Sequence, residues 1–150
     1  MNIVVVGGGA GGLPLVTKLG RRLGKRGKAN ITLVDASASH IWKPRFHEVA
    51  TGAIDSDLDA VDYRAHAHQN HYSFSKGCMS GLDREKKEVI LDPATGPGGK
   101  EILPERRIPY DYLVITVGSL GNDFNTLGVR EQCLFLDTRE QADRFHERFL

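Results

Sequence analysis

The architecture of the chain follows from its first residues, Asn2-Ile3-Val4-Val5-Val6-Gly7-Gly8-Gly9-Ala10-Gly11-Gly12, and from the segment Leu13 to Gly24 that comes after them. Its first part is a short run of β-branched apolar residues, which is typical of a strand buried on both faces. Gly7, Gly9 and Gly12 fit the pattern G-x-G-x-x-G. In that pattern the first glycine permits a tight turn, the second lets the backbone approach a pyrophosphate, and the third lets the helix pack closely on the strand. The stretch therefore predicts a strand, a phosphate-binding turn and a helix whose N-terminus faces the phosphates.

A second apolar run, Ile31 to Val34, follows this helix and ends in Asp35. An acidic residue about 20 positions past such glycines accepts a hydrogen bond from a ribose hydroxyl. Asp35 also argues against a dinucleotide that carries a 2′-phosphate, because such a phosphate is usually bound by an arginine at this place. The alternative is a glycine-rich turn with a capping aspartate and no ligand. Because strand, glycines, helix, second strand and acid agree, the dinucleotide site is the favoured interpretation.

Composition excludes several classes of protein. The 150 residues fit one domain by length, and the formal net charge of +1 gives no case for nucleic-acid binding. Cys78 and Cys133 are far apart in the sequence and are expected to be reduced thiols. No apolar run approaches the ~20 residues of a membrane span. The first strand begins at residue 2, so no signal peptide is expected.

The segment after Asp35 holds the only tryptophan, Trp42, and His47. Pro44 suits the first turn of a short helix through Ala50, with a stop at Gly52. Ordinary packing and a functional role both remain open for Trp42 and His47. The histidine does not belong to a zinc helix, because the second histidine of H-E-x-x-H is absent.

A longer helix is predicted from Asp55 to Asn70, with Leu58, Val61 and Ala65 on one side. Its histidines are interpreted as surface residues rather than metal ligands, because residues two apart on a helix do not face one another. They are His66 and His68, with His71 just beyond. A final helix is predicted near the end of the chain, where Thr138 and Gln141 have the spacing of a capping box.

The remaining apolar runs complete an α/β fold. Strands Tyr72–Lys76 and Tyr112–Val117 are predicted to join the first two in a central parallel sheet. Between them, residues 77 to 108 predict a small antiparallel β-meander of three strands, and its loop from Asp92 to Lys100 is rich in proline and glycine. Gly118 follows the last parallel strand at its carboxyl end, where open α/β sheets bind ligands.

With these residues in view, the sequence closely resembles the N-terminal part of type II NADH dehydrogenases, which are single-subunit flavoprotein NADH:quinone oxidoreductases. Two motifs are shared with the wider superfamily of flavoproteins with two dinucleotide-binding domains: the glycine turn and Tyr110-Asp111-Tyr112-Leu113-Val114-Ile115. Two others are more specific, namely His40-Ile41-Trp42-Lys43-Pro44 and His47-Glu48-Val49-Ala50-Thr51-Gly52. The sequence departs from the superfamily pattern at Pro14 and at Thr116-Val117-Gly118, where Ala-Thr-Gly is common.

The resemblance implies a Rossmann-like FAD-binding domain, and it implies roles for individual residues. Gly7, Gly9 and Gly12 would hold the FAD pyrophosphate, with Gly8, Ala10 and Gly11 in the same turn, and Asp35 would hold the adenosine ribose. Lys43 and Pro44 would lie along the cofactor toward the flavin. The backbone of Met79 would meet the adenine, and that of Val117 and Gly118 would meet the phosphate side. The residues predict no metal site, and none of them stands out as a catalytic acid, base or nucleophile.

The resemblance also implies what a longer parent protein does. Residues 1–150 would be the N-terminal part of the FAD-binding domain, with the NADH-binding domain and the rest of the flavoprotein fold beyond them. The parent would take electrons from NADH to a membrane quinone, attached peripherally to the cytoplasmic face of the inner membrane, while the piece alone would be soluble and self-associating. Two alternatives remain: another flavoprotein such as a sulfide:quinone oxidoreductase, and a non-enzymatic NAD(H)-binding Rossmann module.

Overall fold

The structure is a computed structural model, and it describes residues 1–96 and 101–149. The chain divides into two compact units, which are described here one at a time. The first unit contains residues 1–38 and 62–117, and the second contains residues 39–61 and 118–150. Within the described residues, no helix is both long and apolar enough to cross a membrane.

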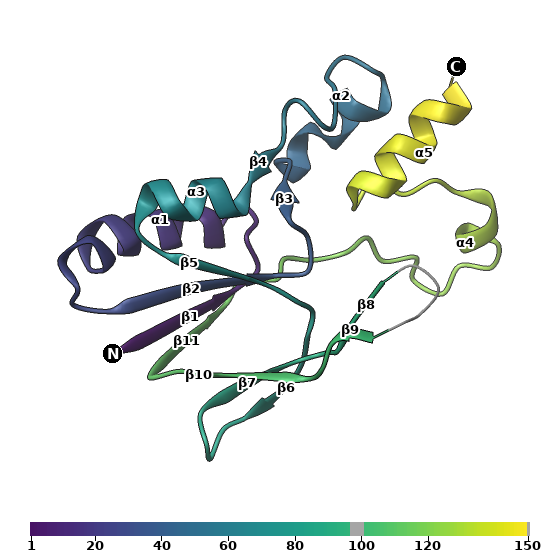
Figure 1. Ribbon diagram of the computed structural model, residues 1–150. Coiled ribbons are helices and arrows are strands. Elements are labelled where there is room, and N and C mark those ends of the chain that lie inside the picture. Colours follow the sequence, from purple (N-terminus) through teal and green to yellow (C-terminus); the bar gives the residue numbers. More distant parts are fainter. Residues whose placement is uncertain (97–100, 150) are drawn as a thin grey trace. The chain divides into compact units, whose positions relative to one another are not determined.

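The first unit is organised around a four-stranded parallel sheet with the order β11-β1-β2-β5 (Figure 1). Its strands are β1 (Asn2–Val6), β2 (Asn30–Asp35), β5 (Ser73–Lys76) and β11 (Tyr112–Ile115). In the register, Val5 lies between Leu33 on β2 and Val114 on β11. The predicted sheet is confirmed, with β1 in its interior. The last strand ends two residues earlier than predicted, at Ile115.

Both faces of β1 are buried, as its run of β-branched residues predicts. Ile3 and Val5 pack into a core with the helices α1 (Gly12–Arg22) and α3 (Tyr63–Asn70). Val4 and Val6 point to the opposite face and pack against Val89 and Leu91 of the antiparallel strands. Alternate side chains of a strand point to opposite faces, so this strand joins two separate cores. Figure 1 shows the resulting three layers of helices, parallel sheet and antiparallel sheet.

Helix α1 follows the glycine turn as predicted and is continued by the short helix η1 (Gly24–Arg26). Val16 is fully buried, and Leu19 and Leu23 pack at the edge of the same core. Pro14 is the third residue of α1. It therefore lies within the first turn, in the part of a helix where backbone N–H groups lack intrahelical acceptors.

The predicted helix from Asp55 to Asn70 is wrong in its first half. Helix α3 begins only at Tyr63, because the Asp62 carboxylate accepts a hydrogen bond from the Ala65 N–H at 2.8 Å and caps it. Upstream, the Asp55 carboxylate accepts hydrogen bonds from two N–H groups of its own turn, which lowers the pKa of Asp55. The apolar spacing there does not mark a buried face, since Leu58 is 85% exposed.

The antiparallel meander is confirmed, with its strands in the order β10-β7-β6. They are β6 (Met79–Asp83), β7 (Glu88–Leu91) and β10 (Arg106–Pro109). The predicted third strand is divided, because β9 (Glu101–Leu103) pairs with β8 (Ala94–Thr95) instead of with β7. The predicted loop from Asp92 thus contains a short strand, and its part at 97–100 lies outside the described residues.

The second unit is built mainly from helices. The predicted short helix is present as two consecutive helices, η2 (Lys43–Arg45), which contains Pro44 in its first turn, and α2 (Phe46–Ala50), which ends before Gly52. Helix α2 packs on α5 (Arg139–Phe149), and their shared core contains Phe46, Val49 and Ala142. The other elements are β3 (Ser39–His40), β4 (Val61–Asp62) and α4 (Val129–Gln132).

Helix α5 starts with the predicted capping box. The Gln141 N–H donates to Thr138 Oγ1, and the Thr138 N–H donates to Gln141 Oε1, both at 3.3 Å. Trp42 is 54% exposed and His47 is exposed on α2, so neither belongs to the core of this unit. Ordinary packing does not explain Trp42.

Candidate nucleotide-binding site

The carboxyl ends of the parallel strands bring three of the predicted segments together in the first unit. The Gly7 N–H donates to the Val34 carbonyl at 2.8 Å, and the Thr116 N–H donates to the Val6 carbonyl at 2.7 Å. The Gly77 N–H donates to the Asp35 carbonyl at 2.8 Å. The loops after β1, β2, β5 and β11 are thus joined at one edge, which is where open α/β sheets bind ligands.

The three fingerprint glycines have different surroundings. A Cβ placed on Gly7 would lie 2.5 Å from the Thr116 carbonyl oxygen, and one placed on Gly12 would lie 1.8 Å from the Gly7 carbonyl oxygen. A Cβ on Gly9 would meet nothing within 4 Å. Gly7 also has a φ of +96°, which favours glycine. The protein's own packing requires the first and third glycines, whereas the second borders open space.

The rest of the turn shows the same division. Gly8 is buried, and a Cβ on it would lie 2.3 Å from the Tyr63 hydroxyl oxygen. Ala10 and Gly11 are exposed at the start of α1. The turn packs against Tyr63 and Thr116 but is open beside Gly9. A pyrophosphate therefore has room at the helix N-terminus, where the helix dipole favours negative charge.

Asp35 ends β2 beside this turn and is half-buried. Its Oδ2 accepts a hydrogen bond from the Gly8 N–H at 2.7 Å, and its Oδ1 accepts one from the Ser37 N–H at 2.8 Å. An ionised carboxylate has about four acceptor positions. The site therefore joins the predicted ribose acceptor directly to the glycine turn and leaves it capacity for a further donor.

Two residues that sequence reasoning did not single out contact the turn. Thr116 Oγ1 donates to the carbonyl oxygen of Gly7 at 2.7 Å. Tyr63 is 1% exposed, and its hydroxyl is hydrogen-bonded to the Asp35 carboxylate. Burial raises the pKa of the Tyr63 phenol, and the charge of Asp35 raises it further. The sequence marks Tyr63 only weakly, because the residue is distinguished only by following Asp62, an aspartate able to cap a helix.

The remaining predicted site residues are divided between the units. Met79, half-buried, begins β6 two residues after Gly77, and Val117 is 68% exposed at the end of the first unit. Gly118 has a φ of +76° and belongs to the second unit, as do Lys43 and Pro44. The first unit by itself therefore brings together the glycine turn, Asp35 and the loops that lead to Met79 and Val117.

Lys43 is held by an ion pair within the second unit. Its Nζ donates to Asp137 Oδ1 at 2.6 Å and to the Ser119 carbonyl at 2.7 Å. Asp137 Oδ2 accepts a hydrogen bond from the Gly121 N–H at 2.8 Å. The Lys43 ammonium, and then the Gly121 N–H, lower the pKa of Asp137. The lysine thus joins η2 to the segment that precedes α5.

The histidines of α3 differ from one another. His68 and His71 are exposed, as predicted, but His66 is half-buried and its Nδ1 lies 2.9 Å from the Tyr72 hydroxyl. Burial, and then the charge of Arg21, lower the pKa of His66. Across residues 1–96 and 101–149, no group of three or more histidine, cysteine or acidic side chains could hold a metal ion.

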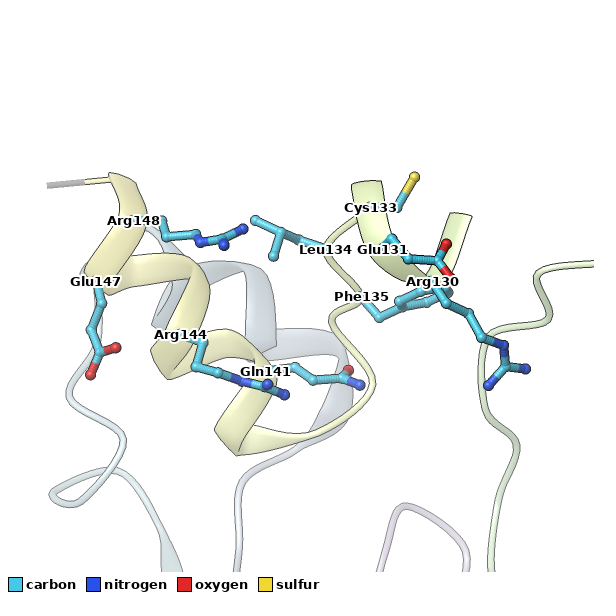
Figure 2. A pocket seen from close by; sticks show the side chains of 9 residues that line it. All are labelled: Arg130, Glu131, Cys133, Leu134, Phe135, Gln141, Arg144, Glu147 and Arg148. Atoms are coloured by element: carbon cyan, nitrogen blue, oxygen red, sulfur yellow. The ribbon is translucent and has the colours of Figure 1, made fainter. Parts of the chain in front are cut away.

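A separate hollow lies in the second unit between α4 and α5 (Figure 2). Arg130, Arg144 and Arg148 line it together with Glu131 and Glu147. Arg130 is already paired with Asp123. The mixed charges give the hollow no clear preference for one ligand, and none of its lining residues belongs to the predicted cofactor site.

A family model described as pyridine nucleotide-disulphide oxidoreductase matches residues 1–150. The chain belongs to this family. Its two cysteines, Cys78 and Cys133, are both free thiols and exposed.

Similarities to individual proteins are more specific than the match to the family. It is 50% identical over 149 residues to a type II NADH:quinone oxidoreductase of Haemophilus influenzae, covering 99% of this chain and 34% of that one. Among solved structures, it matches the sulfide:quinone oxidoreductase of Aquifex aeolicus with a TM-score of 0.74 and 26% identity, covering 99% of this chain and 31% of that one. It matches NDH2 of Plasmodium falciparum with a TM-score of 0.77 and 19% identity, covering 99% and 28%. The first similarity confirms the resemblance predicted from the sequence, and the chain spans about a third of each relative.

Proposed function

We propose that this chain is the FAD-binding segment of an NADH:quinone oxidoreductase, which passes electrons from NADH through FAD to a membrane quinone. The observation that carries the proposal is the 50% identity, over nearly the whole chain, to the Haemophilus influenzae enzyme of that name. The open space beside Gly9 and the Asp35 carboxylate bound to the Gly8 N–H support it. A flavin accepts a hydride from a nicotinamide and returns electrons to an acceptor, while the protein binds and orients it.

The residues of this site fit the adenosine diphosphate half of FAD. The pyrophosphate would lie beside Gly9, where a Cβ meets no protein atom, and the N-terminus of α1 would face it. The Asp35 carboxylate, already joined to the Gly8 N–H, would accept a hydrogen bond from the adenosine ribose. The backbone of Met79 would contact the adenine.

The other assigned residues extend the proposed site. The backbone of Val117 and Gly118 would border the phosphates, and Lys43 and Pro44 would lie toward the isoalloxazine ring. No side chain of this segment is assigned a catalytic role.

We propose the same division of the parent protein that the resemblance implies. Residues 1–150 supply the N-terminal part of the FAD-binding domain, and the NADH-binding domain and the remainder of the fold come from other sequence. This division fits the coverage, since the chain spans 34% of the Haemophilus influenzae relative.

We further propose that the parent binds the cytoplasmic face of the inner membrane peripherally, through regions outside these residues. The 150 residues alone are expected to self-associate. Tyr112 and Ile115, on the outer strand β11, are 62% and 52% exposed, and an apolar strand edge of this kind promotes association.

The test of the proposal is the visible spectrum of the purified full-length protein. A yellow protein that releases FAD on denaturation, and whose flavin is bleached by NADH and reoxidised by a quinone, is the expected result. Tight NADH binding without flavin would instead show a non-enzymatic NAD(H)-binding module and would overturn the assignment.

A second candidate is a sulfide:quinone oxidoreductase, which the match to the Aquifex aeolicus structure favours. That reaction needs reactive cysteines, which would lie later in the sequence than these 150 residues. The same flavin assay separates the candidates, because sulfide rather than NADH would bleach the flavin.

A further inference from the structure

Beneath the glycine turn lies a buried phenol that the proposed binding of FAD leaves unexplained. Tyr63 is the first residue of α3, and its ring packs against Phe74 with centroids 5.1 Å apart. Its hydroxyl end reaches the turn, since a Cβ on Gly8 would lie 2.3 Å from the Tyr63 oxygen. Such contact leaves no room for a side chain between the phenol and the Gly8 backbone.

The same residue is tied to the loop that follows β2. The Tyr63 N–H donates to the Ala38 carbonyl at 3.0 Å, and the Tyr63 hydroxyl is hydrogen-bonded to the Asp35 carboxylate. The carboxylate also accepts hydrogen bonds from the N–H groups of Gly8 and Ser37. Three donors from three segments of the chain therefore converge on one carboxylate.

We propose that Tyr63 is a positioning residue that holds the Asp35 carboxylate in one orientation for the ribose hydroxyl of the bound nucleotide. This inference rests on the proposed function, because it assumes that Asp35 faces a ribose. An aspartate carboxylate can rotate away from a ligand about its two side-chain torsions, and ordering it on binding weakens affinity. The Tyr63 hydroxyl and the two N–H groups order it beforehand, and burial keeps water from competing for the phenol.

The fold offers a matched control for this residue. Tyr72 is also a buried tyrosine, 8% exposed, and burial raises the pKa of its phenol to about 12. Its hydroxyl lies 2.9 Å from His66 Nδ1 instead of from a residue of the nucleotide site. Tyr72→Phe removes a comparable buried hydroxyl from the same core without touching Asp35.

The experiment compares two probes, ADP and 2′-deoxy-ADP, on the full-length protein freed of its flavin. The variants are Tyr63→Phe, Tyr72→Phe, Asp35→Ala and the double variant Tyr63→Phe/Asp35→Ala, and titration calorimetry gives each affinity. We expect Tyr63→Phe to weaken ADP about tenfold and to leave 2′-deoxy-ADP nearly unchanged, so that the preference for the ribose hydroxyl falls. Tyr72→Phe should keep that preference, and Tyr63→Phe should add nothing once Asp35 is replaced.

Two results would overturn the inference while the proposed function stands. One is a Tyr63→Phe protein that still takes up FAD and keeps the full preference for ADP. The other is an equal loss for both probes that persists in the Asp35→Ala background, which would mark Tyr63 as merely structural. Failure of the proposed function looks different, because the unmodified protein would then carry no flavin that NADH can bleach. Thermal unfolding of both phenylalanine variants confirms that they are compared as folded proteins.

Discussion

Two glycines of the turn, Gly7 and Gly12, are required by the packing of the protein itself, whereas Gly9 borders the open space of the proposed pyrophosphate site. Gly7 and Gly12 are pressed against backbone atoms, so a side chain at either would displace the turn itself. Gly9 is identical in chemistry but borders open space. A side chain at Gly12 would therefore disturb the turn, whereas a side chain at Gly9, three residues earlier, would only fill the open space beside it.

We expect substitutions at Gly12 to lower stability and substitutions at Gly9 to affect binding. Gly12→Ala should lower the free energy of unfolding by about 1–3 kcal/mol, because its Cβ would overlap the Gly7 carbonyl oxygen. Gly9→Ala should change it by less than about 0.5 kcal/mol, and Gly9→Val should abolish flavin binding by filling the space of the pyrophosphate. Urea unfolding and flavin absorbance measure the two effects. Normal flavin content in Gly9→Val would contradict the assignment of the turn.

We expect the Asp35 side chain to contribute directly to the affinity for FAD. Asp35→Ala should weaken FAD affinity by roughly 1.5–3 kcal/mol, the range of a hydrogen bond to a charged group. Asp83 is the control, since it also accepts a hydrogen bond from a backbone N–H, that of Lys86, but in the β6–β7 turn. Fluorescence titration of the flavin should show no loss for Asp83→Ala. Equal affinities for the two variants would exclude Asp35 from the cofactor site.

At the scale of elements, single capping residues decide where helices start. Asp62 stops the predicted long helix from extending upstream of Tyr63 and caps α3 instead. Asp62→Ala should lower the free energy of unfolding by ~0.5–2 kcal/mol, because the Ala65 N–H loses its acceptor. Gln69→Ala, an exposed change on the same helix, should stay within about 0.5 kcal/mol. Urea unfolding curves that coincide for the two variants would show that Asp62 does not cap the helix in solution.

The ion pair that joins η2 to the start of α5 should give the second unit a measurable acid sensitivity. The pKa of Asp137 is lowered in the folded chain from an ordinary value of 3.8. Its stabilisation is therefore present above that ordinary value and is lost as the pH falls through the lowered one. Lys43 is 44% exposed, so the pair should contribute only ~0.2–1 kcal/mol.

Lys43→Met tests this linkage. The variant should be less stable than the unmodified protein at a pH of about 6, and the difference should vanish at a pH of about 2. Lys25→Met, at an exposed lysine of η1, serves as the control. Urea unfolding at the two pH values gives the comparison, and a difference that is independent of pH would rule out the pair as its source.

At the scale of the whole molecule, the proposed division of labour limits what these 150 residues can do alone. Hydride transfer needs the nicotinamide held ~3–3.5 Å from the flavin. We expect the isolated chain not to oxidise NADH at a useful rate, even with added FAD, because the proposed NADH-binding domain lies elsewhere. The measurement is NADH oxidation with a soluble quinone beside the full-length protein. Comparable turnover by the two would contradict the division.

The parallel sheet, the meander, the glycine turn and the acid that follows it could all be predicted from the sequence alone. These features depend on local signals, namely runs of β-branched residues, glycine spacing and capping residues. Such signals act over a few positions and do not depend on which distant segments pack against them. The family resemblance was readable for the same reason, since its motifs are short. Local signals also misled, because the spacing of Leu58, Val61 and Ala65 suits a helix that the structure does not form.

The surroundings of the Asp35 carboxylate follow from tertiary packing and could not be predicted from the sequence. Asp35 lies 27 residues from Gly8 in the sequence, and Tyr63 reaches both from a helix that starts later than its spacing predicted. Nothing local marks these three as neighbours, because they meet only where α3 packs on the sheet and the loops after β1 and β2 converge. The exposed state of Trp42 and the ion pair of Lys43 were likewise settled by packing, since burial and pairing depend on which distant segment covers a side chain.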